Sequence, residues 1–350
     1  MFVGLRDLWF ARGRFALMTT VVALVALLVV MLSGLTAGLA ADNVSAIEHL
    51  EATHIVFQDS GDGPSYDQSR LRTHDIEQWT QLPGVTAATP LGISRATMTA
   101  GDSSIPVVLF AAETGTFLAP SQLGTDGTVV IPSALADRHQ LSTNDRLTIS
   151  DSTFAVSIVP SGHSFSHSPV VWMDLHDWQQ ITGNDGSATV FALQADSGID
   201  GQPIKGSVVK PLNDTFSAIG SFPAENGSLQ MIRGFLLVIS ALVIGAFFTV
   251  WTIQRRHDVA VLKAMGASTR YLLADALGQA LIVLTASALI GGITGFMIGE
   301  LVSGSVPFVS DVATTVYPLL IMVAIGLLGA ALAIRSITKV DPLTALGGSK

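Results

Sequence analysis

Two groups of histidine and acidic residues come nearest to the patterns of metal sites and hydrolases. His163 and His167 lie close together in one segment, and imidazole is a common zinc ligand. Asp174, His176 and Asp177 follow, and serine hydrolases combine such side chains with a nucleophile. The sequence contains neither an HExxH cluster nor a Gly-x-Ser-x-Gly turn. We therefore interpret the first pair as part of a polar loop and the second group as the start of a helix.

Other chemistries are excluded by residues that the chain lacks. It has no cysteine, which removes disulfides, thiolate metal sites and cysteine nucleophiles. No G-x-x-x-x-G-K-[ST] loop is present to bind nucleotide phosphates, so the chain itself is not expected to hydrolyse ATP. The net charge of −9 argues against nucleic-acid binding. With 49% apolar and only 13% charged residues, the chain is predicted to be a membrane protein.

Four apolar runs are each long enough to span a bilayer as a helix, which takes about 20 residues. The predicted transmembrane helices are residues 15–41, 233–254, 276–299 and 312–334. The small-x-small sequence Gly38-Leu39-Ala40 leaves a cleavable signal peptide as an alternative for the first run. Its apolar stretch is longer than a typical signal-peptide core, which favours a retained signal anchor.

The basic residues near the helix ends predict the orientation in the membrane. They cluster in residues 1–14, 255–275 and 335–350, which an even number of helices places on one side. The positive-inside rule makes that side the cytoplasm, so both termini are expected there. Residues 1–14 are expected to form an amphipathic helix on the inner leaflet, and residues 300–311 a short external loop. Residues 42–232 contain 7 basic and 21 acidic side chains and are expected to lie outside.

The external segment has the pattern of an α+β domain inserted between the first and second membrane helices. Short apolar runs separated by turn residues predict strands, and longer mixed stretches predict helices. The predicted strands are residues 54–57, 107–112, 128–131, 147–149, 154–159, 170–173 and 189–193, and the predicted helices are 133–139 and 174–182. The alternation of both kinds of element argues against a β-sandwich.

The cytoplasmic loop that follows the second membrane helix has the pattern of a short amphipathic helix. Val259, Leu262 and Met265 share one face at helical spacing, whereas charged side chains lie on the other face. Gly266 is expected to end this helix. A basic connector that binds anionic headgroups would explain the arginines but not the Ala-Met-Gly-Ala-Ser sequence around Gly266.

Residues 255–268 resemble the corresponding loop of ABC transporter permeases of the MacB/FtsX/LolC type, R-x-x-E-[IV]-A-[IL]-[LM]-[RK]-[AS]-[LIM]-G-A-[ST], with Asp258 where Glu is usual. The tail 337–346 is similar to the closing K-x-D-P-x-x-A-L of that family. Residues 129–181 resemble its periplasmic or extracellular core domain. The plan of one helix, a large insert and three further helices is also shared, so the resemblance covers most of the chain.

The resemblance implies a non-catalytic permease that pairs with a second copy of itself and with two copies of a separate ATPase, which binds ATP and Mg²⁺. It places the chain in a bacterial cell membrane, in contact with lipids. The resemblance also implies that ATP hydrolysis moves helices 1 and 2 and that this movement reaches the external domain. This is the mechanotransmission scheme of type VII exporters. The residues implied to contact the ATPase are Arg255, Arg256, Asp258, Val259, Leu262, Lys263, Met265 and Gly266.

The predicted spans contain no ionisable residue between their ends, which argues against a hydrophilic substrate and for an apolar or amphiphilic one. Length and plan are similar to the haem-efflux branch of the family. That likeness implies haem as a transported ligand rather than a resident cofactor, with Met31 and Glu225 as possible iron ligands and Arg233 as a partner of a propionate. Two alternatives remain: export of a peptide, antibiotic or lipid, and an FtsX-like signal relay to an external cell-wall hydrolase. Finally, the stripe Gly291, Gly295 and Gly299 predicts close helix packing.

Overall fold

The computed structural model describes residues 12–124, 127–196, 198–199, 204–254, 261, 265–303 and 306–338. The chain divides into two compact units, a helical unit (Met1–Gly38 and Gly227–Lys350) and an α+β unit (Leu39–Asn226). The predicted amphipathic helix 1–14 lies almost entirely outside the described residues, as does most of the tail 335–350. Each unit is described by itself.

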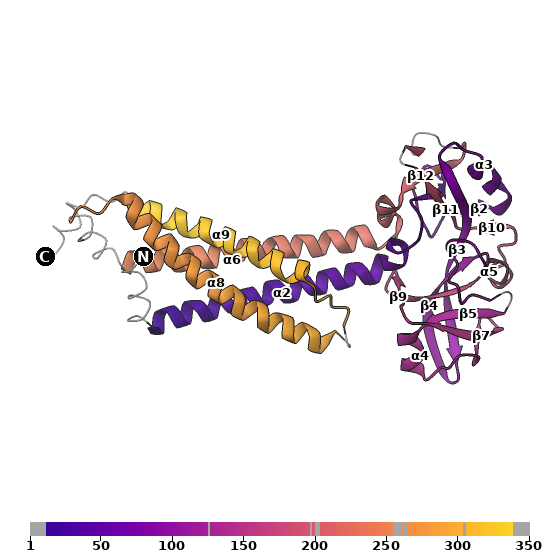
Figure 1. Ribbon diagram of the computed structural model, residues 1–350, viewed down its shortest axis with the longest axis horizontal. Coiled ribbons are helices and arrows are strands. Elements are labelled where there is room, and N and C mark those ends of the chain that lie inside the picture. Colours follow the sequence, from indigo (N-terminus) through magenta and orange to yellow (C-terminus); the bar gives the residue numbers. More distant parts are fainter. Residues whose placement is uncertain are drawn as a thin grey trace. The chain divides into compact units, whose positions relative to one another are not determined.

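Four long helices carry the helical unit (Figure 1). They are α2 (Arg12–Glu48), α6 (Phe222–Gln254), α8 (Thr269–Val302) and α9 (Val312–Thr338). Each is long and apolar enough to cross a membrane. All four predicted spans lie within them, and each helix is longer than its apolar run. The reason is that polar ends continue the backbone hydrogen bonding beyond the hydrocarbon-compatible stretch.

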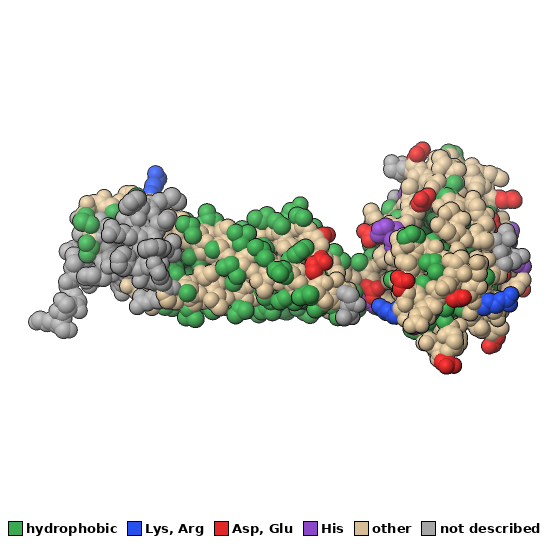
Figure 2. All heavy atoms as spheres, turned by 60° about the horizontal axis from the view of Figure 1, so that its bottom comes forward, with side chains coloured by type: hydrophobic (Ala, Val, Ile, Leu, Met, Phe, Trp, Pro, Cys, Tyr) green, Lys and Arg blue, Asp and Glu red, His purple; other side chains and the backbone are tan. Residues whose placement is uncertain are grey.

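Small residues allow α2 and α8 to pack closely. A Cβ on Gly291 would collide with the backbone carbonyl of Ala23, and one on Gly295 would lie 3.1 Å from the side chain of Val30. The predicted glycine stripe is therefore a packing surface. Apolar side chains of all four helices form the buried core of the unit. Further apolar side chains cover its described outer surface, whereas acidic side chains concentrate on the α+β unit (Figure 2).

The α+β unit is built around one large sheet. Its strands are β1 (His54–Gln58), β3 (Val85–Ala100), β4 (Ser103–Ala112), β5 (Thr128–Pro132), β6 (Arg146–Ile149), β7 (Ser152–Val159), β8 (Ser164–Phe165), β9 (Ser168–Asp174), β11 (Val190–Ala195) and β12 (Ser207–Pro211). Strands β2 (Leu71–Arg72) and β10 (Ser187–Ala188) form a separate pair. The helices are α3 (Ile76–Thr80), α4 (Ser133–His139) and α5 (Leu175–Thr182), with 3-10 helices η1 (Thr73–Asp75) and η3 (Leu212–Ala218).

One part of the sheet closes on itself. The strand order β12-β1-β11-β3-β4-β9-β5-β7-β6 ends next to β3, because Met98 of β3 pairs with Ile149 of β6. Strands β3, β4, β9, β5, β7 and β6 thus form a ring. Alternate side chains of these strands fill its interior with a buried core that includes Met98, Leu109, Val129 and Ile149. Closure removes the free strand edges that would otherwise need protection.

The other part, β12-β1-β11-β3, buries both of its faces. Ile55 and Phe57 of β1 enter one core, which also contains Ile47 from the end of α2. Val56 between them enters a second core together with Trp79 of α3. Because successive side chains of β1 point to opposite faces, the strand contributes to both cores, and each core also contains a residue from a helix. The α+β unit therefore anchors the last turns of α2 in its own core.

Candidate functional site

Within the α+β unit, the hairpin turn between β8 and β9 contacts the end of α2. Ser166 and His167 form its two-residue loop and have φ angles of 49° and 61°. Such a left-handed pair is usually Asn-Gly, so Ser-His needs support from its surroundings. That support comes from α2, because the backbone N–H groups of Ser166 and His167 donate to the carbonyl oxygens of Asn43 (2.9 Å) and Asp42 (3.1 Å).

The imidazole of His167 binds two carboxylates at once. Its Nε2 lies 2.8 Å from Oε2 of Glu225 at the start of α6, and its Nδ1 lies 3.3 Å from Oδ2 of Asp42. Partial burial lowers the pKa of His167, but the hydrogen bonds and charges of Glu225 and Asp42 outweigh it, so the pKa is raised above its usual value. With an acceptor at each nitrogen, the imidazolium is the form that satisfies both contacts.

The buried Asn43 completes this contact. Its Nδ2 donates to Oε2 of Glu225 at 3.0 Å. We call Asp42, Asn43, Ser166, His167 and Glu225 the joint. All five residues belong to the α+β unit, and they come from α2, the β8–β9 turn and α6. The joint therefore holds the adjoining ends of two membrane-type helices on one turn of the sheet.

The three residues implied by the resemblance to haem-efflux permeases do not all belong to the same unit. Glu225 lies in the first turn of α6 rather than in a loop ahead of it, because α6 begins at Phe222. Its Oε2 is already engaged by the joint. Met31 is half-buried on α2 and Arg233 half-buried on α6, and both belong to the helical unit.

Most of the predicted ATPase-contacting loop lies outside the described residues, including Arg255, Arg256, Asp258, Val259, Leu262 and Lys263. The part that is described ends a helical turn. The N–H of Met265 donates to the carbonyl oxygen of Val261 at 3.0 Å, and Gly266 then adopts a φ of +96°. The Met265 side chain is 72% exposed, which leaves a large apolar group open to solvent at the end of this turn.

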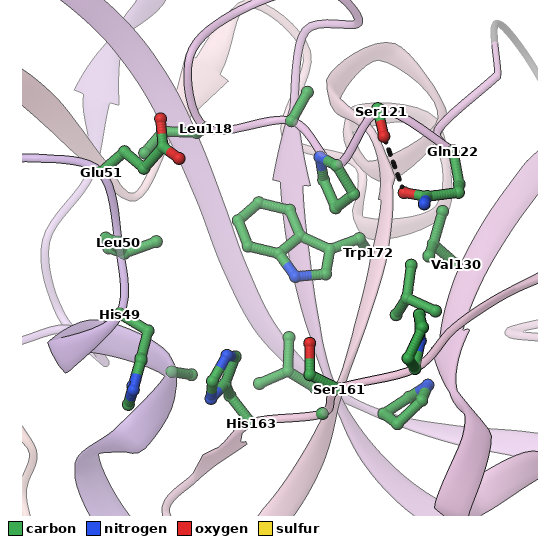
Figure 3. Close-up of a pocket in the computed structure, with 18 of the residues that line it drawn as sticks. His49, Leu50, Glu51, Leu118, Ser121, Gln122, Val130, Ser161, His163 and Trp172 are labelled. Carbon is green, nitrogen blue, oxygen red and sulfur yellow. Dashed lines mark hydrogen bonds between the residues drawn. The ribbon is translucent and has the colours of Figure 1, made fainter.

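A cavity of about 650 Å³ opens within the α+β unit. The indole of Trp172 lies at its centre, with His49 and His163 on one side and Val130 on the other (Figure 3). Phe117 adds a further aromatic side chain to the lining. Among the described residues that line it there is no lysine or arginine. A cavity of this size, whose wall combines the Trp172 indole and other apolar groups with a similar share of polar groups, is large enough for a small organic ligand.

The imidazoles of His49 and His163 stack, with ring centroids 4.2 Å apart and planes at 20°. Nδ1 of His49 lies 2.9 Å from the carbonyl oxygen of Ser45, which can only accept, so this nitrogen carries the proton. Burial lowers the pKa of His163, and the neighbouring His49 lowers it further against the opposing charge of Glu48. The lowered pKa favours the neutral form of the His163 imidazole at neutral pH.

The structure separates the two histidines that the sequence had placed together. His163 faces the cavity, whereas His167 belongs to the joint. Among the described residues no group of three potential ligands could hold a metal ion. The second group does start a helix, since Asp174 caps α5 by accepting from the N–H of His176 at 2.8 Å. Sequence reasoning missed His49 and Trp172 as neighbours of His163. His49 is distant from it in the sequence, and Trp172 is not part of a binding motif.

Two family models together match most of the chain. Residues 15–210 match the MacB-like periplasmic core domain, and residues 231–342 match the FtsX-like permease C-terminal domain. The boundary between the matches falls near the start of α6, where the α+β unit ends and the chain returns to the helical unit.

Full-length relatives are also similar. The chain is 25% identical over 352 residues to a proposed hemin transport system permease protein, HrtB, of Staphylococcus epidermidis, with 99% of both chains covered. It is 25% identical over 362 residues to an uncharacterized ABC transporter permease of Mycobacterium tuberculosis, also with 99% of both covered. The extracellular domain of the noncanonic ABC-type transporter YknZ from Gram-positive bacteria matches 46% of this chain and 100% of its own, with 10% identity and a TM-score of 0.35.

Four helices long and apolar enough to span a membrane, with a MacB-like domain inserted after the first, are the plan of a membrane protein with an external domain. The chain belongs to the ABC transporter permeases that combine a MacB-like periplasmic core domain with an FtsX-like C-terminal permease domain. The α+β unit is the external domain of that family, as the sequence predicted.

Proposed function

We propose that this chain is the permease of a mechanotransmission (type VII) ABC exporter that removes haem from the bacterial cell membrane. A separate ATPase chain binds ATP and Mg²⁺, and two permeases assemble with two ATPases. The likeness to the hemin transport permease, which spans 99% of both chains, carries the choice of substrate. The unbroken apolar character of the four spans supports an amphiphilic substrate over a hydrophilic one.

The joint supports mechanical coupling. α2 is one continuous helix from Arg12 to Glu48, and its end is held by the core around Ile47 and by the hydrogen bonds of Asn43. α6 begins at the same joint through Glu225. Packed helices behave as stiff elements, so displacement of either one acts directly on the β8–β9 turn. Movement driven from the cytoplasmic side would thereby reach the external domain.

The loop after α6 supplies the ATPase contact in this proposal. The exposed Met265 is an apolar anchor of the kind that dominates interface energies, together with Val259 and Leu262. Arg255, Arg256, Asp258 and Lys263 act as charged groups around it, and Gly266 ends the helix and sets its length.

For haem we propose Met31 as a thioether ligand, Glu225 as a carboxylate ligand and Arg233 as the partner of a propionate. Because Glu225 bonds to Asn43, which lies about 18 Å further along α2 than Met31, these two side chains are alternative iron ligands and do not share one iron. Oε2 of Glu225 already accepts from His167, so ligation through that atom would break the contact with His167. Haem binding by Glu225 would in this way alter the joint, which links substrate to mechanics.

Hemin titration of the purified permease with its cognate ATPase tests the proposal. We expect a saturable Soret shift in the wild type. Met31→Ala should bind hemin about tenfold more weakly, because one ligand is lost. Met297→Ala, an exposed methionine on α8, is the matched control. For Glu225→Ala, His167→Ala is the control, because it also opens the joint but keeps the carboxylate. Absence of any saturable shift would overturn the haem proposal and leave the ABC permease family unaffected.

A further inference from the structure

The cavity of the α+β unit is a candidate site that the proposed membrane site does not use. All its lining residues lie between Ala46 and Trp172, within one compact unit. The turn directly after α2 contributes His49, and the segment before β8 contributes His163. Neither histidine takes part in the joint. Two stacked imidazoles at the wall of a cavity are nitrogen donors without a structural task that requires both.

The geometry of His49 prepares one of its nitrogens for a ligand. Nδ1 donates to the carbonyl oxygen of Ser45, so the lone pair of the neutral ring is on Nε2. Metal-binding histidines commonly use one nitrogen in this way while the other binds the metal. The ring is also solvent-exposed, so an entering group can reach it.

The rest of the lining decides between a bare ion and a metal that brings its own ligands. A lone Zn²⁺ ion needs about four ligands, and the described residues offer no group of three. Haem iron already has four porphyrin nitrogens and needs only one or two from the protein. The cavity volume of about 650 Å³ and the central indole of Trp172 suit a flat apolar ring (Figure 3).

The charges of the lining fix the orientation of such a ligand. Because no lysine or arginine lines the cavity and Glu51 does, the propionates are repelled from the interior. They would remain in water at the open side, while the porphyrin ring and iron enter. The lining thus matches a metalloporphyrin better than a polyanion such as a nucleotide.

We propose that this cavity is a second, external haem site, in which an imidazole of His49 or His163 ligates the iron and Trp172 packs against the porphyrin. The inference rests on the proposed export of haem and extends it to a station outside the membrane spans. It assigns the external domain a part in handling the substrate in addition to transmitting motion.

Hemin binding by the full-length permease with its ATPase tests this site. We expect two classes of binding site in the wild type. The double variant His49→Ala/His163→Ala should lose one class, seen as at least about tenfold weaker binding and loss of the spectroscopic signal of imidazole-ligated iron. Met31→Ala should retain that signal. His74→Ala, a 70% exposed histidine on η1, is the matched control.

Two further measurements keep the outcomes distinct. His49→Gln/His163→Gln preserves side-chain size, and an unchanged thermal transition establishes that the variant is folded. Metal-free protoporphyrin should bind the wild type about tenfold more weakly than hemin, because it cannot use the imidazole. Hemin binding that is unchanged in both double variants overturns the external site. If the Met31-dependent class survives that result, export of haem stands; if hemin binds at neither site, both proposals fall.

Discussion

At the scale of single residues, His167 unites two roles that the sequence does not reveal. Its backbone adopts a left-handed turn that Ser-His sequences rarely favour, and its side chain bridges Asp42 and Glu225. The strained turn persists because carbonyl groups of α2 accept both of its N–H groups. No local pattern signals such a turn, since its support comes from residues more than 120 positions away.

The joint predicts a pH-dependent stability. The pKa of His167 is raised on folding, so its contribution is fully present below the unfolded pKa of about 6.5 and is lost as the pH rises through the folded pKa. We expect His167→Gln to lower the melting temperature of the full chain near pH 6, with the difference from wild type shrinking towards pH 9. Thermal unfolding in detergent, followed by circular dichroism, measures this difference.

His139→Gln provides the control for that series, because His139 lies on α4 away from the joint. Its difference from wild type should not shrink between the same two pH values. A His167→Gln effect that grows with rising pH would contradict the assigned ion pairs, because a neutral imidazole would then be the stabilising form.

Some of the candidate binding residues could be predicted from the sequence, and others could not. The start of α5 at Asp174 was predictable, since capping depends on neighbours in the sequence. The cavity was not, because His49 and His163 are far apart in the sequence and meet only through the packing inside the α+β unit. Met31, Glu225 and Arg233 came from family resemblance, and their roles stay predictions.

At the scale of elements, the apolar runs predicted seven strands and both longer helices of the α+β unit correctly. Strand β3 (Val85–Ala100) escaped prediction because alanine, threonine, Pro90 and Gly92 give it little hydrophobic alternation. It is stabilised instead by pairing with β11, β4 and β6. At Gly92, between its pairings with β11 and β4, a Cβ would lie 2.7 Å from the ring of Trp178, so only glycine fits there.

The loop between α8 and α9 provides the first element-scale prediction. Phe308 packs against Gly34 of α2 and Gly299 of α8, where any Cβ would collide with its ring. Val309 adds a hydrogen bond from its N–H to the carbonyl of Gly34 at 3.1 Å. We expect Gly299→Val to lower the free energy of unfolding by about 1–3 kcal/mol through overpacking.

A double-mutant cycle in detergent unfolding measures that contact. Combining Gly299→Val with Phe308→Ala should cost less than the sum of the two single changes, because the smaller side chain makes room for valine. Gly234→Ala on α6, where a Cβ meets nothing within 4 Å, should cost nothing. Strictly additive costs would show that Phe308 does not fill this position.

The loop that follows α6 provides a second element-scale prediction. Met265→Glu places a charge on the proposed apolar anchor and should weaken binding of the ATPase by about tenfold or more. Met265→Leu should preserve binding, since it keeps an apolar side chain of similar size. Affinity is measured by titrating purified ATPase onto the permease in nanodiscs, and equal affinities for the two variants would refute the contact.

At the scale of the whole molecule, composition and the spacing of apolar runs were enough to predict four spans and one inserted domain. Those features depend on long stretches of sequence and on the bilayer, and not on particular contacts. The continuation of α2 into the core of the α+β unit was not predictable, because the polar residues after Ala41 look like the start of a loop. The mechanical link proposed for this family member depends on that continuation.

The orientation in the membrane is the last property open to direct measurement. Because the chain has no cysteine, a single introduced thiol reports its own side of the membrane without any background substitution. Asp102→Cys lies in the exposed turn between β3 and β4, and Met265→Cys lies in the loop after α6 that is predicted to be cytoplasmic. A membrane-impermeant maleimide should label the first in intact cells and the second only after permeabilisation. Labelling of Met265→Cys in intact cells would place the basic loop outside, against the positive-inside rule, and would leave a cytoplasmic ATPase nothing to bind there.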